Sequence, residues 1–269
     1  MQKKLLLILL SMPALLLGKI TESSSFSDIL KYVENETLVV CDIDNTLIES
    51  TRQLGSNQWG EYLIHQLRSS GKSTLEALAI EGKIWRKASP SITMQLVDPE
   101  TARVIDDLQS RQIHVIGLTA RHGNGSAITE EQLQSVRIDL TKNEIVKEKI
   151  QIPFRIPAIY ENGILYCSTS NTKSAVLTAF LAKTEYQPKR IVFIDDKLSH
   201  VQDLEETFKE SPIEYIGIRF SGADARVKAF NPEIAEIQYE ALPKIISDKE
   251  AMRMIDAAKQ AEITPQLVP

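Results

Sequence analysis

The sequence is poor in the residue types that mark several whole classes of protein. Its 269 residues include only two cysteines, 11 glycines and 11 prolines. Two cysteines are too few for a disulfide framework, and the low glycine and proline content argues against collagen-like, disordered and repeat chains. There is no run of basic residues, and the net charge of -5 makes nucleic acid a poor candidate partner. The remaining composition, 43% hydrophobic and 25% charged, is that of a globular protein.

Long hydrophobic runs are absent, with one exception at the N-terminus. Residues 1–4 are short and basic, and residues 5–18 are mostly apolar. This run is too short to cross a bilayer comfortably, but it suits the core of a secretory signal peptide. We therefore predict that residues 1–18 are a signal peptide, that the protein is exported to the periplasm or secreted, and that it meets a membrane only through this leader. Leu16 is a poor match to the usual cleavage pattern, so an uncleaved anchor stays open, as does a buried first helix.

The two cysteines are predicted to have a structural role. Cys41 lies within an apolar run, where a free cysteine behaves as a small buried hydrophobe. A bridge between Cys41 and Cys167 is the alternative, since an exported protein permits one.

Short apolar runs alternate with helical patterns along most of the chain. The runs cover residues 37–42, 113–118, 190–194 and 213–218, and a hairpin with an Asn-Gly turn is predicted at 160–166. This alternation predicts an α/β protein with a mostly parallel sheet covered on both faces, a Rossmann-like three-layer α/β/α sandwich.

The order of these patterns predicts the domain organisation. Residues 19–50 and 98–248 are expected to form the α/β core, and residues 51–97, which show a helical pattern broken at 69–71, a small helical cap inserted after the first strand. Residues 249–269 are expected to be a helical tail.

Three of the predicted strands end in polar residues. Asp42 and Asp44 follow the first, Thr119 the second, and Asp195 and Asp196 the third. Each alone is explained equally well as a turn or helix cap. Because ligands bind at the carboxyl ends of the strands in such sheets, the combination predicts a site at that edge. Four carboxylates there need a cation, most simply Mg²⁺, a hard ion that prefers oxygen ligands.

These residues resemble the motifs of the haloacid dehalogenase (HAD)-like phosphohydrolase superfamily, in the same order. Residues 42–46, Asp-Ile-Asp-Asn-Thr, match its D-x-D-x-T motif, and residues 118–121, Leu-Thr-Ala-Arg, match its threonine motif. Lys173 matches its basic motif, and Asp195-Asp196 its acidic motif. The resemblance thus extends over residues 42–196, and the helical insertion stands where many members carry a cap.

The resemblance assigns the central chemistry to the first motif. Asp42 would be the nucleophile that forms an aspartyl-phosphate, and Asp44 the acid that protonates the leaving oxygen and then the base that activates water. Asp44 favours a phosphatase, because P-type ATPases carry threonine there and the dehalogenases lack this acid. Mg²⁺ would be held by Asp42, by the backbone carbonyl of Asp44 and by Asp196, with Asp195 nearby.

The remaining motif residues would bind the phosphate. Thr119 and the backbone N–H of Ala120 would donate hydrogen bonds to it, Arg121 is a candidate for a second anionic group on the substrate, and Lys173 would supply a fixed positive charge. Lys197 competes for the role of Lys173, but Lys173 begins a helix that precedes the last acidic strand, as the resemblance requires.

One position departs from the pattern of the superfamily. Four residues after Asp196, where an Asp or Asn is usual, the chain has His200. It could accept a hydrogen bond from a metal-bound water, or this contact could be missing.

Side chains of the predicted cap have two interpretations. The side chains in question are those of Trp59, Tyr62, Trp85, Arg86 and Lys87. We expect the aromatic side chains mainly to pack the cap, with substrate contact as the alternative.

Together these inferences predict a Mg²⁺-dependent phosphomonoester hydrolase acting on a small phosphorylated substrate. Two alternatives remain, a catalytically weak phospho-ligand or metal-binding protein with the same fold and a phosphotransferase. The sequence predicts neither the identity of the substrate nor the oligomeric state.

Overall fold

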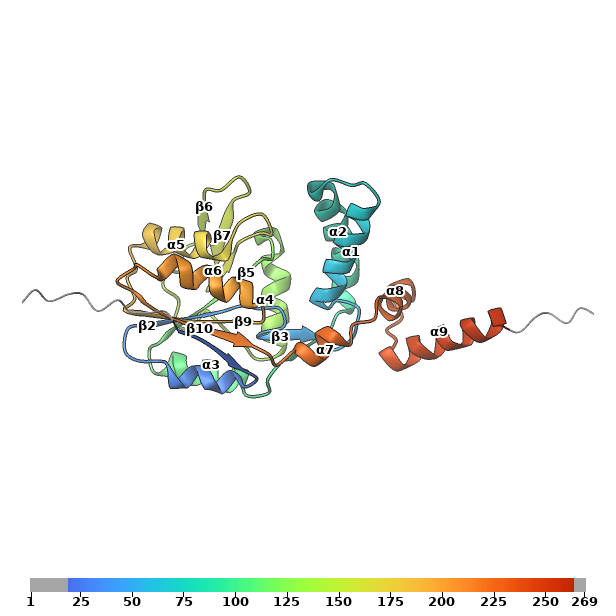
Figure 1. Cartoon of the computed structure of the whole chain (residues 1–269), viewed down its shortest axis with the longest axis horizontal. Coiled ribbons are helices and arrows are strands. Elements are labelled where there is room, and N and C mark those ends of the chain that lie inside the picture. Colours follow the sequence, from blue (N-terminus) through green and yellow to red (C-terminus); the bar gives the residue numbers. More distant parts are fainter. Residues whose placement is uncertain (1–18, 264–269) are drawn as a thin grey trace, which may run out of the picture.

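A computed structural model describes residues 19–263 of the chain (Figure 1). The predicted signal peptide, residues 1–18, lies outside the described residues, as do residues 264–269. Within the described part, no helix combines the length and apolar character needed to cross a membrane.

The centre of the molecule is an eight-stranded sheet. In spatial order its strands are β1 (Lys19–Ser23), β10 (Glu214–Phe220), β9 (Arg190–Asp195), β2 (Thr37–Cys41), β5 (His114–Thr119), β8 (Ile164–Tyr166), β7 (Ala158–Glu161) and β6 (Ile150–Ile152). The first six strands run parallel, and β7 is antiparallel to both of its neighbours. The predicted mostly parallel α/β sheet is therefore confirmed.

Side chains of the central strands alternate between two hydrophobic layers. In β2, Leu38 and Val40 pack on one side of the sheet, whereas Val39 and Cys41 pack on the other. Such alternation follows from the period of two in a strand, and both sides are apolar because helices cover both faces.

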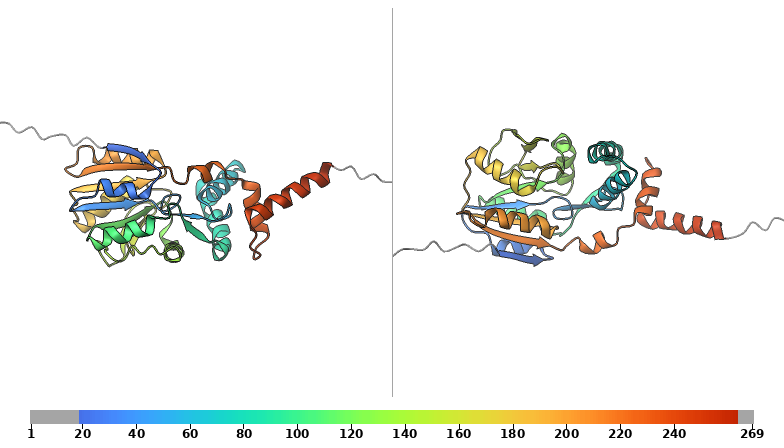
Figure 2. Two further views of the ribbon diagram at one scale, coloured as in Figure 1. Left: turned by 90° about the horizontal axis from the view of Figure 1, so that it is seen from below. Right: turned by 45° about the horizontal axis from the view of Figure 1, so that its top comes forward.

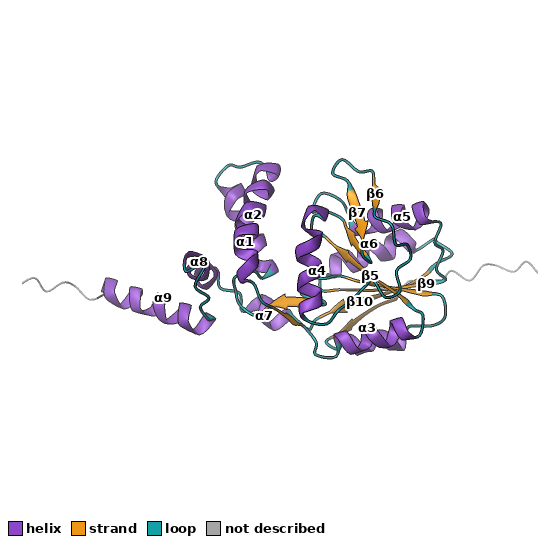
Figure 3. Ribbon diagram, turned by 180° about the vertical axis from the view of Figure 1, so that it is seen from behind, coloured by secondary structure: helices purple, strands orange, loops and turns teal. Residues whose placement is uncertain are grey.

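Helices cover the two faces of the sheet as the prediction of three layers requires (Figure 3). One face is covered by η1 (Phe26–Lys31), α3 (Thr101–Ser110) and α4 (Ser126–Ser135), and the other by α5 (Lys173–Thr184) and α6 (Leu198–Phe208). The Rossmann-like sandwich is thus present.

A helical cap stands beside the sheet, on the side of the strand carboxyl ends (Figure 1). It contains α1 (Asn57–Ser69) and α2 (Thr74–Ala88), and the short antiparallel pair β3 (Ile48–Ser50) and β4 (Met94–Leu96) joins it to the core. The buried centre of the cap also takes Ala235 from α8 (Pro232–Glu240), although the sequence assigns that segment to the core.

The chain after the last strand leads away from the sheet. From β10 it passes through α7 (Asp224–Lys228) and α8 to α9 (Asp248–Ile263), which extends away from the rest of the molecule in both views of Figure 2. Helices α8 and α9 share a small cluster around Ile234, Ile246 and Ile255. Helix α9 covers the first part of the segment 249–269 that was expected to be a helical tail, and residues 264–269 lie outside the described part.

Several local predictions can be compared with the structure. Residues 158–166 form a hairpin whose turn residues, Asn162 and Gly163, both have positive φ (50° and 76°), as the Asn-Gly signal predicts. Cys41 and Cys167 are free and buried in opposite hydrophobic layers, so they form no bridge in this structure. Strand β1 was not predicted, because a half-exposed strand at the sheet edge lacks a continuous apolar run.

Candidate functional site

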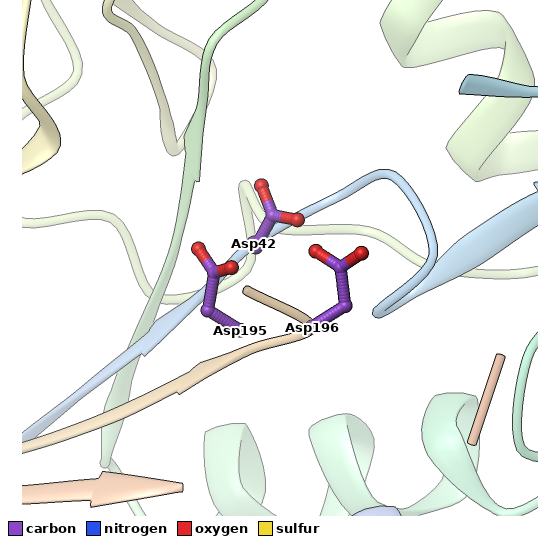
Figure 4. Close-up of side chains that lie close together, drawn as sticks. All are labelled: Asp42, Asp195 and Asp196. Atoms are coloured by element: carbon purple, nitrogen blue, oxygen red, sulfur yellow. The ribbon is translucent and has the colours of Figure 1, made fainter. Parts of the chain in front are cut away.

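Three carboxylates converge at the carboxyl ends of two neighbouring strands. Asp42 follows β2 directly, and its backbone N–H donates to the carbonyl of Ile194 in β9. Asp195 ends β9 and Asp196 follows it. Their carboxyl groups point to the same side in Figure 4, and one oxygen of each lies within 4.8 Å of the others. Adjacent parallel strands therefore bring together acids that are about 150 residues apart in sequence.

Lys173 links two of these carboxylates. Its Nζ donates to Asp42 Oδ1 at 2.5 Å and to Asp195 Oδ2 at 2.6 Å, and its side chain is only 4% exposed. Burial opposes its charge, but the two carboxylates prevail and raise the pKa of Lys173 above its usual value. Lys173 is thus a permanent buried cation, and it begins α5 where the capping side chain of Thr172 fixes the first turn.

Asp196 lacks the cationic partner that Asp42 and Asp195 share. Within residues 19–263 it forms no ion pair, and its side chain accepts only from Asn45 Nδ2, at 3.3 Å. Burial, together with repulsion from Asp42 and Asp195, raises the pKa of Asp196 to about 8. Burial likewise raises the pKa of Asp42 to about 6, although Lys173 opposes the shift. The cluster therefore carries more negative charge than its described side chains compensate.

Asp44 faces the same space but is held by a different partner. Arg121 donates to it through two nitrogens, Nε at 2.8 Å and Nη2 at 2.7 Å. Burial alone would raise the pKa of Asp44, but this forked ion pair outweighs it and lowers the pKa. Arg121 Nη1 in turn donates to Thr129 and Gln132 of α4, which fixes the guanidinium. Arg121 is thus engaged with Asp44, whereas the sequence suggested contact with a substrate.

A small cavity joins most of the predicted site residues. It has a volume of about 30 Å³. Of the residues predicted from sequence, those that line it are Asp42, Asp44, Thr119, Ala120, Lys173 and Asp196. Thr119 ends β5 and is 1% exposed, and its Oγ1 also accepts from the backbone N–H of Arg121 at 3.2 Å. The structure thus collects residues from β2, β5, α5 and β9 around one point.

Asp195 and His200 form the inner wall of the site. Asp195 is fully buried, and His200 Nδ1 lies 3.1 Å and 3.2 Å from its two oxygens. Burial alone would raise the pKa of Asp195, but Lys173 and His200 lower it to about 2. Asp195 is consequently occupied by these two partners, while His200, at the position that departs from the resemblance, lines the cavity.

The cap closes over this cavity through polar side chains. Asn57 at the start of α1 lines it, as does Lys197 beside Asp196. Glu61 accepts from Lys197 Nζ at 2.6 Å and from Asn57 Nδ2 at 3.0 Å. Lys197, the competitor of Lys173 in the sequence, is thus paired with the cap and makes no described contact with Asp42 or Asp195.

The large side chains of the cap divide into two groups. Trp59 is 1% exposed and packs against Trp85 and Tyr239, with ring centroids 5.4 Å and 5.9 Å away. Lys87 lies over the Tyr239 ring, 4.8 Å from its centroid, and neither Lys87 nor Arg86 lines the cavity. Tyr62 instead faces an outer groove between α1 and the segment that follows α7.

Sequence reasoning missed several residues of this site. Asn57 and Glu61 approach through the cap, and Thr129 and Gln132 support Arg121 from α4. No short-range pattern marks such residues, because their positions depend on how the cap and α4 pack on the sheet. Thr46 was within the matched motif without an assigned role, and its hydroxyl donates to Asp42 Oδ2 at 3.3 Å.

Comparisons with known proteins identify relatives over most of the chain. A protein named "Putative outer membrane protein" from Chlamydia trachomatis (serovar D) is 26% identical over 228 residues, covering 84% of each chain. One with the same description from Chlamydia pneumoniae is 24% identical and covers 85% of each. An uncharacterized protein of Rickettsia prowazekii is 24% identical and covers 81% of each.

A family model also matches the chain, over residues 22–252. The match begins in β1 and ends in α9, so it includes the sheet, the cap and every residue of the site. The chain therefore belongs to the family described as "Protein of unknown function (DUF2608)".

Proposed function

We propose that this protein is a Mg²⁺-dependent phosphomonoester hydrolase of the HAD-like superfamily, acting through a covalent intermediate on Asp42. The observation that carries the proposal is the arrangement around Lys173. One buried ammonium group joins Asp42 to Asp195, and Thr119, Ala120 and Asp44 surround the same cavity. A phosphoryl group needs a nucleophile, hydrogen-bond donors and a proton-transfer group around one point, and these residues offer all three.

The donor set fits a hard divalent cation. The buried carboxylates of Asp42 and Asp195 and the partly buried one of Asp196 offer oxygens within 4.8 Å of one another, and Asp196 forms no ion pair among the described residues. Asp42, Asp196 and the backbone carbonyl of Asp44 would hold the ion, while Asp195 stays with Lys173 and His200. When bound, Mg²⁺ supplies positive charge that offsets the repulsion between the acids and the phosphate.

The first chemical step forms a bond between Asp42 and phosphorus. A carboxylate oxygen of Asp42 attacks the phosphoryl group, and the bond from phosphorus to the leaving oxygen breaks. The Thr119 hydroxyl and the Ala120 N–H donate to phosphoryl oxygens, while Lys173 remains charged beside the nucleophile. Asp44 gives its proton to the leaving oxygen, which departs as an alcohol.

The second step releases phosphate and restores Asp42. Asp44, now a carboxylate, takes a proton from water as that water attacks phosphorus and the bond to Asp42 breaks. The forked contact with Arg121 suits this step because it keeps Asp44 ionised and oriented. For the first step, the negative charge of a bound phosphate opposes the effect of Arg121 and raises the pKa of Asp44. Arg121 is thus a positioning residue in this proposal.

An envelope location is also part of the proposal. Residues 1–18 have the pattern of a signal peptide. The names of three chlamydial relatives refer to the outer membrane and support export. We infer that the mature protein works outside the cytoplasm, in the periplasm or at the cell surface.

Turnover of p-nitrophenyl phosphate by the purified mature protein tests the activity. We expect hydrolysis with Mg²⁺, no hydrolysis after EDTA treatment, and a loss on the order of 10³-fold or more in Asp42→Asn. Asp203→Asn is a matched control, since Asp203 is an exposed acid on α6 outside the site. Equal turnover in Asp42→Asn and Asp203→Asn would refute the proposal, and product that appears only with an added alcohol would identify a phosphotransferase.

A further inference from the structure

An outer groove lies between α1 of the cap and a wall formed by the end of α7 and the segment that follows it. It has a volume of about 440 Å³, within the range of small-molecule sites. The residues that define it are Gln58, Glu61, Tyr62 and His65 from α1, and Val227 and Phe230 from the other wall. The four residues of α1 are spaced three or four apart, so they share one face of that helix.

One side chain, Glu61, links this groove to the carboxylate site. Glu61 lines the groove, and its Oε1 accepts from Lys197 and from Asn57, both of which line the inner cavity. The inner cavity, with about 30 Å³, is much smaller than the groove, with about 440 Å³. A substrate larger than the inner cavity would reach the groove where Glu61 and Lys197 separate. That separation would connect the cavity at Asp42 with the groove.

The walls of the groove select a particular kind of group. Tyr62 and Phe230 present two rings with centroids 6.3 Å apart and planes at 57°. The Tyr62 hydroxyl is already bonded to Glu236, so its ring face is what it offers. None of the described residues lining the groove is Lys or Arg, and Glu61 adds negative charge. Such walls favour an aromatic group that is neutral or positively charged and disfavour a second phosphate or carboxylate.

We propose that this groove binds the leaving group of the substrate, and that the substrate is the phosphate monoester of an alcohol bearing an aromatic, non-anionic group. The inference rests on the proposed phosphatase function. The phosphate lies at Asp42 and Thr119, the ester passes the position of Glu61, and the aromatic group packs against Tyr62 and Phe230. This assignment fits the engagement of Arg121 with Asp44, which leaves it unsuited to a second anion.

Two esters with similar leaving groups test this assignment. Benzyl phosphate and ethyl phosphate both release a primary alcohol, but only the first carries a ring. With the Mg²⁺-loaded protein we expect kcat/KM to favour benzyl phosphate about tenfold, mainly through KM. Tyr62→Ala should reduce this preference to about twofold, whereas Tyr62→Phe should keep it. Gln202→Ala is the control, because Gln202 is exposed on α6 and does not line the groove.

Binding to an inactive variant separates this inference from the phosphatase proposal. Calorimetry with Asp42→Asn should show benzyl phosphate binding about tenfold more tightly than ethyl phosphate, and the further change Tyr62→Ala should remove the difference. Equal binding of the two esters to Asp42→Asn, or a preference that survives Tyr62→Ala, would overturn the groove assignment even if the protein is a phosphatase. Hydrolysis of neither ester, with the binding preference intact, would count against the phosphatase alone.

Discussion

The carboxylate site and the helical cap are built in different ways. At the site, Asp42, Lys173 and Asp195 are nearly fully buried and joined by contacts of 2.5 and 2.6 Å. Pairing of β2 with β9 sets the positions of Asp42 and Asp195, and the start of α5 sets that of Lys173. The cap gathers α1, α2 and α8 around Trp59, from segments well over 100 residues apart. Its ion pair beside the cavity, between Glu61 and Lys197, is about half exposed to solvent, with exposed fractions of 55% and 41%.

The contrast indicates which region is rigid and which can move. Charges buried at the site cannot separate without leaving an uncompensated ion, which costs several kcal/mol. The exposed pair at the cap is worth at most about 1 kcal/mol and can open at little cost. The fold thus combines a fixed carboxylate site with a cover that, under the proposed function, would part to admit a substrate.

Removing the buried cation should have the largest effect. Lys173→Met leaves Asp42 and Asp195 facing each other without it, so we expect a loss of about 3–5 kcal/mol in the free energy of unfolding together with loss of activity. Lys197→Met, the matched change at the cap, should cost less than about 1 kcal/mol. Urea denaturation with EDTA present measures the free energy of unfolding of both variants. Similar losses in the two would contradict the distinction between a rigid site and a cap that can move.

Damage to the centre of the cap should be large but local. Trp59→Ala removes a buried ring that packs against Trp85 and Tyr239, and we expect the cap to lose about 3–5 kcal/mol. The fluorescence of Trp85 should then report an early unfolding step, while far-UV circular dichroism shows the core unfolding later. A single transition seen by both probes would show that cap and core unfold as one unit.

Loss of the contact that holds Asp44 should lower kcat by different factors for different substrates. In Arg121→Lys the forked contact is lost, so proton transfer to the leaving oxygen is impaired. We expect kcat to fall about 10²-fold for benzyl phosphate, whose leaving group needs that proton, but less than tenfold for p-nitrophenyl phosphate. Asp44→Asn should give the same pattern in the first step. A uniform loss for both esters would assign Arg121 to phosphate binding instead.

Neutralising Asp196 should separate stability from metal binding. Asp196→Asn removes a partly buried charge that forms no ion pair among the described residues, so the metal-free protein should gain about 1 kcal/mol. The same change should abolish the rise in Tm that Mg²⁺ produces in the unaltered protein. Thermal unfolding with and without Mg²⁺ measures both effects. A metal-free variant of lower stability, or one that still responds to Mg²⁺, would contradict the assignment.

The smallest effect concerns the cap and depends on pH. Burial raises the pKa of Glu81 on α2 to about 7, with Arg86 opposing the shift. Because its folded pKa lies above the unfolded value of 4.5, the protonated form contributes stability below pH 4.5, and this is lost as pH rises to 7. Glu81→Gln should therefore raise Tm by roughly 2–4 °C at pH 8 and leave it unchanged at pH 4. A rise of equal size at both pH values would show that the charge of Glu81 is not its cause.

The sequence predicted the core better than the cap for a physical reason. An apolar run that ends in Asp or Thr marks a buried strand and its carboxyl end, and both can be recognised from a few neighbouring residues. Parallel pairing of such strands then brings Asp42, Thr119 and Asp196 to one edge of the sheet. The contacts of Arg121 with Asp44 and of Glu61 with Lys197 depend on side-chain rotamers and on packing between separate segments. No periodicity encodes these contacts, so an arginine expected at the substrate was found with Asp44.

In the cap, too, the sequence predicts individual helices but not how separate helices pack together. Helices α1 and α2 were predictable from their own patterns, including the break between them. That α8 packs against Trp59 depends on the path of the chain after β10, which local propensity does not specify. The outer groove exists only because of that packing, and for this reason the sequence did not indicate it.

The measurement that tests the central claim most directly is a search for phosphate bound covalently to Asp42. Asp44→Asn should form the intermediate from p-nitrophenyl phosphate but release it slowly, since the base for the second step is missing. Acid quenching and mass spectrometry should then find one phosphoryl group on the peptide containing residues 38–47, at Asp42 and sensitive to hydroxylamine. If Asp44→Asn hydrolyses the ester while this peptide stays unmodified, Asp42 is not the nucleophile and the account of the site is wrong.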